Sequence, residues 1–243
     1  MNPMNYDYLP EVYDQDPYSD KKFRFDVSQE LSLDDFLNQL KVADDDESRR
    51  QTVMSNFYKI CDCKLKNSER YKKASSIPFD YVPLDKHKDQ YKKRGEVVYI
   101  IVFDGNVVKI GFTTDGMKNR HTSYNAGSRT TRKKGTPSTT NFHITESIYT
   151  ALSDGKKVEW YAYDVPPAEV TTDCFGTGIM KTMKVSYGSE LESYLIDEYV
   201  RLKGHRPILS KNSWLRQFLK CHTITWFLCH PVPLYWYEKH TPP

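Results

Sequence analysis

The 243-residue chain has no apolar run long enough to cross a bilayer. Its longest apolar stretches, at 97–103 and 224–228, fall far short of the roughly 20 residues that a transmembrane helix needs. Residues 1–20 are acidic and aromatic, whereas a secretory signal joins a basic stretch to an apolar one. We therefore expect a protein without a membrane span that stays inside the cell that makes it.

Cysteine is scarce, with five residues in the chain. So small and odd a number excludes the disulfide framework of a small secreted protein, and we expect free thiols. Two Cys-His dipeptides, at 221–222 and 229–230, offer zinc-type ligands, but the spacing within each pair is not the usual one. Cys61 and Cys63 stand two residues apart, which on a helix places them on different faces and disfavours a metal pair.

Acidic residues are absent between Asp115 and Glu146. Charge is also segregated along the chain, because residues 1–50 carry a net charge of −7 and residues 51–243 a net charge of +10. The acid-free window holds six basic residues, Lys118, Arg120, Arg129, Arg132, Lys133 and Lys134. Such a stretch suits a polyanion, since neutralising phosphates releases condensed counterions. The alternative is a solvated loop of positive charge.

Residues 1–94 are expected to form a helical N-terminal extension and a linker. Ser32 followed by Asp35 has the form of a capped helix start, and apolar residues then recur at helical spacing. A second helical pattern runs from 53 to 65. Residues 75–94 are polar, contain two prolines and have no steady period, which predicts the linker.

The pattern changes at residue 96. Two β-branched and aromatic segments, 96–103 and 107–112, flank the turn sequence Asp104-Gly105-Asn106 and predict a β-hairpin. A third strand is predicted at 157–165 and a strong helix at 189–202. Between the hairpin and the third strand we expect a helix over 118–124 and then a loop over 126–141, rich in Gly, Ser, Thr and Pro. The predicted fold is α+β, a small antiparallel three-stranded sheet flanked by helices.

The hairpin and the residues after it resemble the GIY-YIG nuclease superfamily. The triplets Val97-Val98-Tyr99 and Lys109-Ile110-Gly111 stand where that family has Gly-Ile-Tyr and Tyr-Ile-Gly. Lysine replaces tyrosine at 109, as in the compact GIY-YIG restriction endonucleases and in viral and phage members. Four further family positions are matched in order, by Arg120, Tyr124, Glu192 and Asn212.

The resemblance implies a nuclease core over residues 95–215, followed by a C-terminal extension over 216–243. The implied activity is Mg²⁺-dependent cleavage of double-stranded DNA, with Mn²⁺ as another usable ion. The chain looks most like a type II restriction endonuclease. Two alternatives stay open: a viral, phage or mobile-element GIY-YIG endonuclease without a restriction role, and a DNA-binding module whose catalytic site has lapsed.

Hydrolysis of a phosphodiester needs an activated water and stabilisation of charge on the phosphate. By resemblance, Glu192 supplies one oxygen ligand to Mg²⁺, an ion that leaves its other positions to water and substrate. Tyr99 is the candidate general base, and we expect Lys109 and Arg120 to lower the pKa of its phenol. Arg120 also clamps phosphate, and Tyr124 orients either of its neighbours.

Each of these residues also has a simpler interpretation. A strand tyrosine such as Tyr99 is usually core packing, and Lys109 could protect a sheet edge. Ser189 and Glu192 match a capping box, so Glu192 could merely begin a helix. The conjunction of residue types in family order favours the catalytic interpretation.

The implied partner is double-stranded DNA, contacted by Lys118 and by the basic loop residues Arg129, Arg132, Lys133 and Lys134. A homodimer on a palindromic site and a cognate DNA methyltransferase in the host are compatible with such an enzyme. The expected location is the cytoplasm of a bacterium, or the interior of the host cell for a viral protein.

Overall fold

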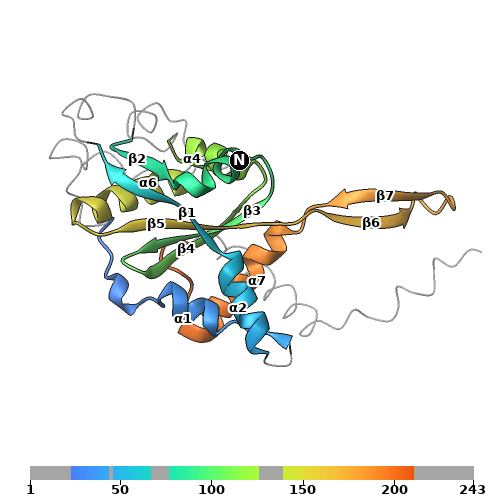
Figure 1. The fold of residues 1–243 in the computed structure, drawn as a ribbon, viewed down its shortest axis with the longest axis horizontal. Coiled ribbons are helices and arrows are strands. Elements are labelled where there is room, and N and C mark those ends of the chain that lie inside the picture. Colours follow the sequence, from blue (N-terminus) through green and yellow to red (C-terminus); the bar gives the residue numbers. More distant parts are fainter. Residues whose placement is uncertain (1–22, 44–45, 67–76, 126–138, 211–243) are drawn as a thin grey trace, which may run out of the picture. The chain divides into compact units, whose positions relative to one another are not determined.

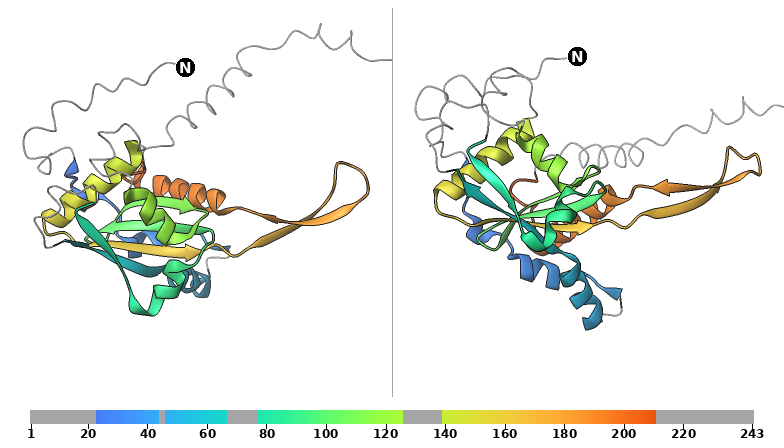
Figure 2. Two further views of the ribbon diagram at one scale, coloured as in Figure 1. Left: turned by 90° about the horizontal axis from the view of Figure 1, so that it is seen from above. Right: turned by 45° about the horizontal axis from the view of Figure 1, so that its top comes forward.

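The computed structural model describes residues 23–43, 46–66, 77–125 and 139–210. They form a five-stranded antiparallel sheet with helices on both faces, and a separate two-stranded ribbon (Figure 1, Figure 2). The strands are β1 (Tyr58–Leu65), β2 (Phe79–Pro83), β3 (Val97–Phe103), β4 (Asn106–Thr113), β5 (Val158–Asp164), β6 (Ala168–Asp173) and β7 (Met180–Val185). The helices are α1 (Leu33–Asn38), α2 (Glu47–Asn56), α3 (Lys88–Lys92), α4 (Gly116–Asn125), α6 (Thr139–Ser153) and α7 (Gly188–Lys203), with short 3-10 turns at Val27–Gln29 and Asp85–His87.

The chain divides into two compact units, residues 1–210 and 211–243, and the second lies outside the described residues. Within the described part of the first unit, no helix is both long and apolar enough to cross a membrane. The described cysteines, Cys61, Cys63 and Cys174, are free thiols, as expected. Cys61 and Cys63 both belong to β1 and to the same buried cluster, so the expectation that they occupy different helix faces is wrong.

The sheet, in the order β2-β1-β5-β3-β4, lies between two helical layers. Every residue of β3 is buried, as in a strand that is covered on both faces. On one face, Met117 of α4 and Ile148 of α6 join a core that includes Tyr99. On the other face, Phe36 of α1 and Tyr199 of α7 belong to a second core, which includes Ile100 of β3. Helices α4 and α7 therefore reach β3 from opposite sides.

The expected β-hairpin is confirmed as β3 and β4. Its turn residues Asp104 and Gly105 have φ of 48° and 86°, as in the type I′ turns that match the twist of paired strands. The Asp104 carboxylate accepts a hydrogen bond of 2.7 Å from the backbone N–H of Lys157, which ties the turn to the start of β5. The third expected strand is β5, which pairs with β3.

The sheet is larger than the three strands expected from the sequence. The helix predicted over 53–65 is wrong beyond Asn56, because the next residues form β1, which pairs with β5. The linker predicted over 75–94 is also wrong, because it contains β2 and α3. Short apolar segments fit both periodicities, and pairing with a distant strand decides between them. The fold is α+β, as expected.

Helix α7 begins differently from the predicted capping box. Its N-cap is Tyr187, without a side-chain cap, and its first residue, Gly188, donates its backbone N–H to the Glu96 carboxylate at 3.2 Å. The hydroxyl of Ser189 donates to its neighbour Glu190 at 2.8 Å. The beginning of this helix therefore does not require Glu192.

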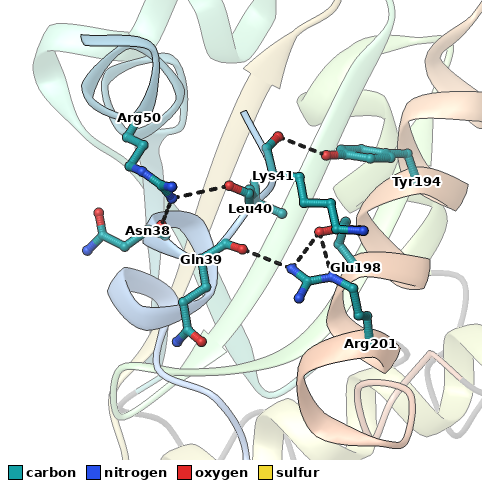
Figure 3. A network of polar contacts seen from close by, with 8 residues as sticks. All are labelled: Asn38, Gln39, Leu40, Lys41, Arg50, Tyr194, Glu198 and Arg201. Atoms are coloured by element: carbon teal, nitrogen blue, oxygen red, sulfur yellow. Dashed lines mark hydrogen bonds and ion pairs between the residues drawn. The ribbon is translucent and has the colours of Figure 1, made fainter. Parts of the chain in front are cut away.

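Polar contacts fasten α7 to the segment that follows α1 (Figure 3). Arg201 donates to the carbonyl oxygen of Gln39 at 3.0 Å and pairs with Glu198 at 2.7 Å. The hydroxyl of Tyr194 donates to the carbonyl oxygen of Lys41 at 3.3 Å. These bonds help to hold α7 in place over the sheet.

Strands β6 and β7 form a ribbon of their own between β5 and α7. The ribbon projects away from the sheet and its helices (Figure 1, Figure 2). None of its residues is buried. The sequence patterns did not predict strands in this region.

Candidate active site

Tyr99 lies in the middle of β3 and is completely buried. Gly111 faces it directly on β4. A Cβ at position 111 would overlap the Cζ and Oη atoms of Tyr99, so the phenol ring occupies the space that a side chain would need. The tyrosine of one triplet thus requires the glycine of the other.

Helix α4 supplies two more residues of the site. Its first residue, Gly116, has φ of +78°, and a Cβ there would overlap the carbonyl oxygen of Lys93, so this start requires glycine. Arg120 and Tyr124 follow one helical turn apart. Arg120 donates from Nε to the Tyr99 hydroxyl at 2.9 Å and from Nη2 to the Tyr124 hydroxyl at 3.0 Å. The two hydroxyl oxygens lie 2.7 Å apart, which closes a triangle of hydrogen bonds.

The two phenols differ in how readily they ionise. Burial raises the pKa of Tyr99, while the charge of Arg120 and the hydrogen bonds from Tyr124 and Arg120 oppose that rise. Burial and the neighbouring Tyr99 both raise the pKa of Tyr124, to well above its ordinary value. Tyr99 is therefore the phenol whose anion has better support, with Tyr124 as its hydrogen-bond donor. The expectation that cations bring the pKa of Tyr99 below its ordinary value is wrong, because burial has the larger effect.

Arg120 itself stays charged. Burial works against its positive charge, but the phenols of Tyr99 and Tyr124 raise the pKa of the guanidinium above its ordinary value. The guanidinium also lies 4.5 Å from the centre of the Tyr124 ring. The triangle therefore contains a permanent positive charge.

Lys109 lies on β4, opposite Ile101, and is only 8% exposed. Burial lowers the pKa of its amine to about 8; Glu192 opposes this shift and Arg120 adds to it. The simpler interpretation, an exposed lysine that protects a sheet edge, is wrong because the side chain is buried. This amine loses its charge just above neutral pH.

Glu192 lies in the second turn of α7 and is half-buried. Its charge raises the pKa of both Tyr99 and Lys109, so it acts on the same site from the opposite helical layer. In the described part of the chain, no three His, Cys, Asp or Glu side chains gather into a metal site. One carboxylate suits Mg²⁺, since this ion commonly takes one or two protein carboxylates and fills its remaining positions with water and phosphate oxygens.

An aromatic layer that the sequence did not single out lies behind the phenols. The Trp160 ring of β5 lies 5.3 Å from that of Tyr99 and 5.7 Å from that of Tyr124. His121 lies 4.5 Å from Trp160, and its Nδ1 is 3.0 Å from the Tyr91 hydroxyl. Burial lowers the pKa of His121 well below its ordinary value, so its ring is neutral. A tryptophan in a strand is usually a core residue, so no local sequence pattern could have assigned Trp160 to the site.

The structure brings together five of the predicted catalytic residues, Tyr99, Lys109, Arg120, Tyr124 and Glu192. Lys118, predicted to contact DNA, is exposed in the first turn of α4. The remaining predicted site residues lie outside the described residues: Asn212, Arg129, Arg132, Lys133 and Lys134. The two Cys-His dipeptides lie outside them as well.

No protein-family model matches the chain, and no curated protein matches it. Among solved structures, it is similar to restriction endonuclease HPY188I in complex with product DNA, with 24% identity and a TM-score of 0.40; the match covers 76% of this chain and 94% of that one. It is also similar to a mutant of bacteriophage T4 EndoII, with 21% identity and a TM-score of 0.42, over 65% of this chain and 95% of that one.

Proposed function

We propose that this chain is a metal-dependent endonuclease that hydrolyses a phosphodiester bond of double-stranded DNA. The observation that carries the proposal is the triangle of Tyr99, Arg120 and Tyr124, with the buried Lys109 close enough for the charge of Arg120 to lower its pKa. These are positions at which the sequence resembles the GIY-YIG nucleases. Burying charged groups is costly, so a purely structural role gives no reason to place the Arg120 guanidinium between two phenols and to bury Lys109 within range of its charge.

Tyr99 is the proposed general base. Its oxygen accepts from Arg120 and lies within hydrogen-bond distance of Tyr124, so an anion formed there has donors already in place. Such a base takes the proton of the attacking water. Lys109 is a second candidate for this role, because its pKa of about 8 gives an appreciable neutral fraction near physiological pH.

Arg120 is the proposed phosphate clamp. A guanidinium has five N–H donors, and two of those on Arg120 bind the phenols. The others can bind a phosphate oxygen and stabilise the charge that develops during hydrolysis. The same side chain would thus link the substrate to the base.

Glu192 is the proposed ligand of Mg²⁺, with Mn²⁺ as a substitute. The ion supplies positive charge to the phosphate and the leaving oxygen. Helix α7 and its bonds to the N-terminal segment hold Glu192 on the side of the site opposite α4.

Within this class we propose a sequence-specific type II restriction endonuclease. Its nuclease core spans 95–215, the N-terminal part over 1–94 completes the sheet with β1 and β2, and the C-terminal extension over 216–243 adds to the DNA-binding surface. Homodimerisation on a palindromic site belongs to the same proposal. A viral, phage or mobile-element endonuclease would use the same site without a restriction role. A DNA methyltransferase gene beside the gene for this chain would favour the restriction role over the others.

The test is cleavage of supercoiled plasmid DNA by the full chain, with Mg²⁺ or with a chelator. Glu192→Gln should abolish cleavage but bind DNA as tightly as wild type or more so, because a negative charge near phosphate is removed. The matched control is Glu190→Gln, an exposed carboxylate two residues away that should cleave normally. Cleavage by a folded Glu192→Gln chain would contradict the metal role. Metal-independent DNA binding by a wild type that never cleaves would indicate a lapsed site.

A further inference from the structure

The ribbon of β6 and β7 has one apolar face that the described residues leave uncovered. Side chains alternate between faces along a strand, and Val170 pairs with Met183 across the ribbon. These two are 47% and 48% exposed. The apolar face comprises Ala168, Val170, Met183 and Val185. Toward the tip this face continues with the polar pair Thr172 and Lys181. The opposite face is mostly polar: Glu169 pairs with Lys184, the hydroxyls of Thr171 and Thr182 lie 2.8 Å apart, and Met180 is its one apolar residue.

The tip of the ribbon presents a fully exposed phenylalanine. Phe175 has φ of +60° and no part of its side chain is covered. The turn around it is held by its own hydrogen bonds, because the Asp173 carboxylate accepts from the backbone N–H of Gly178 and the Thr177 hydroxyl donates to the Cys174 carbonyl oxygen. A firm turn with an apolar ring at its end has the form of a wedge.

The base of the ribbon carries three cations and is connected along the chain to elements of the candidate active site. Lys93, Arg94 and Lys184 line a cavity of about 470 Å³ there, together with two carboxylates, Glu96 and Asp164. The Glu96 carboxylate accepts from the first N–H of α7. One strand of the ribbon follows β5, the neighbour of β3, and the other leads into α7, which carries Glu192.

Isolated two-stranded ribbons are marginally stable in water, so an uncovered apolar face indicates a partner. A second copy of the chain could cover that face. It would not explain why the ribbon is anchored in the elements of the candidate site, with three cations at its base. Double-stranded DNA accounts for the cations, for the ribbon form and for the exposed Phe175, because its phosphates bind cations, its grooves admit a two-stranded ribbon, and apolar wedges can enter between its base pairs.

We propose that the β6–β7 ribbon is a DNA-binding arm, that Lys93, Arg94 and Lys184 contact the backbone at its base, and that Phe175 inserts between base pairs at its tip. Six-residue strands span about 20 Å, so the tip reaches about six base pairs from the base of the ribbon. The inference rests on the proposed function, since it takes the substrate to be double-stranded DNA. The arm would thus unstack or bend the duplex where its tip enters.

The test uses the full chain without divalent metal, so that no cleavage occurs. Closed circular plasmid is relaxed by a metal-independent topoisomerase in the presence of the chain, because wedge insertion untwists DNA and changes its linking number. Wild type should shift the topoisomer distribution and Phe175→Ala should not. Phe175→Ala should also lower duplex affinity by about 10- to 100-fold, the loss typical of a stacked aromatic side chain. Phe175→Leu should keep part of both effects.

The matched control is Leu65→Ala, an exposed apolar residue far from the ribbon in the sheet, which should behave as wild type. An equal topoisomer shift by wild type and Phe175→Ala would overturn the arm and leave the nuclease proposal standing. If sedimentation showed that Phe175→Ala loses a dimer that wild type forms, with DNA affinity unchanged, the ribbon would bind a second copy of the chain. That result would also overturn the proposed DNA-binding arm. A wild type that binds no DNA would overturn both proposals.

Discussion

The ring of Tyr99 fills the space beside Gly111, its direct partner across β3 and β4. This relationship joins the two triplets that the sequence places about ten residues apart. It also sets the position of the Tyr99 hydroxyl, which meets Arg120 and Tyr124 from α4. The glycine is therefore part of the site although it has no side chain.

Gly111→Ala should displace the Tyr99 ring from its two partners. We expect a loss of cleavage of about 100-fold or more, since a displacement of 1 Å can cost that much, and a destabilisation of about 1–3 kcal/mol from overpacking. Plasmid cleavage and urea unfolding measure the two effects. In a Tyr99→Ala background, the stability cost of Gly111→Ala should nearly disappear. Equal costs in both backgrounds would show that the ring and the glycine are independent.

Tyr99→Phe and Tyr124→Phe should differ in their pH dependence. Tyr99→Phe removes the proposed base, so cleavage should fall by about 10²- to 10⁴-fold at every pH. Tyr124→Phe removes a donor to the Tyr99 anion and raises the pKa of that phenol further, so its rate should be lower than that of wild type but should still rise with pH, a rise that Tyr99→Phe lacks. Rates of cleavage between pH 6 and 10 distinguish the two variants. The reverse pattern would assign the base to Tyr124.

Lys109→Met tests whether the lysine acts as a cation or as a base. If the charged amine supports the Tyr99 anion, the wild-type rate rises with pH and levels off near pH 8, where Lys109 loses its proton. The variant should then be slow at neutral pH but continue to gain rate above pH 8. A variant that stays slow at high pH would make Lys109 the base instead. If Lys109→Met cleaved with the same dependence on pH as wild type, Lys109 would have no part in the mechanism.

Lys109 should also make stability depend on pH. Its pKa is about 8 in the folded protein and near 10.5 in the unfolded chain, so the unfolded state binds more protons between these values. Stability should therefore rise with pH, by about 2 kcal/mol from pH 7 to 9.5. Denaturant unfolding of wild type and Lys109→Met isolates this contribution, because other groups titrate alike in both. If the free energy of unfolding changed with pH in the same way in wild type and in Lys109→Met, the proposed shift in the pKa of Lys109 would be contradicted.

The basic loop remains a prediction outside the described residues. Neutralising its four cations together, Arg129, Arg132, Lys133 and Lys134, should flatten the slope of log affinity against log salt. The expected change is up to about three to four units if all four touch phosphate. DNA binding across a salt series measures it. An unchanged slope would support the alternative, a solvated loop.

Local patterns in the sequence were enough to predict several elements correctly. The hairpin of β3 and β4 is encoded by two apolar segments around an Asp-Gly turn, and the capped start at Ser32 forms as expected, with its side chain accepting from Asp35. Such features involve neighbouring residues only, so they do not depend on the rest of the fold. The spacing of Arg120 and Tyr124 likewise places both on one face of a helix.

Other features depend on residues distant in sequence, and only the tertiary structure decided them. β1 is a strand because it pairs with β2 and β5, although its apolar spacing also suits a helix. The pKa of Lys109 falls because the folded chain buries it, and that of Tyr99 rises for the same reason. Trp160 joins the site through contacts with rings from other elements. The sequence by itself determined which residue types were present and in what order. Burial and long-range pairing decided the protonation and the partners of these residues. Protonation and partners depend on what the rest of the chain places around each side chain, and no local pattern contains that information.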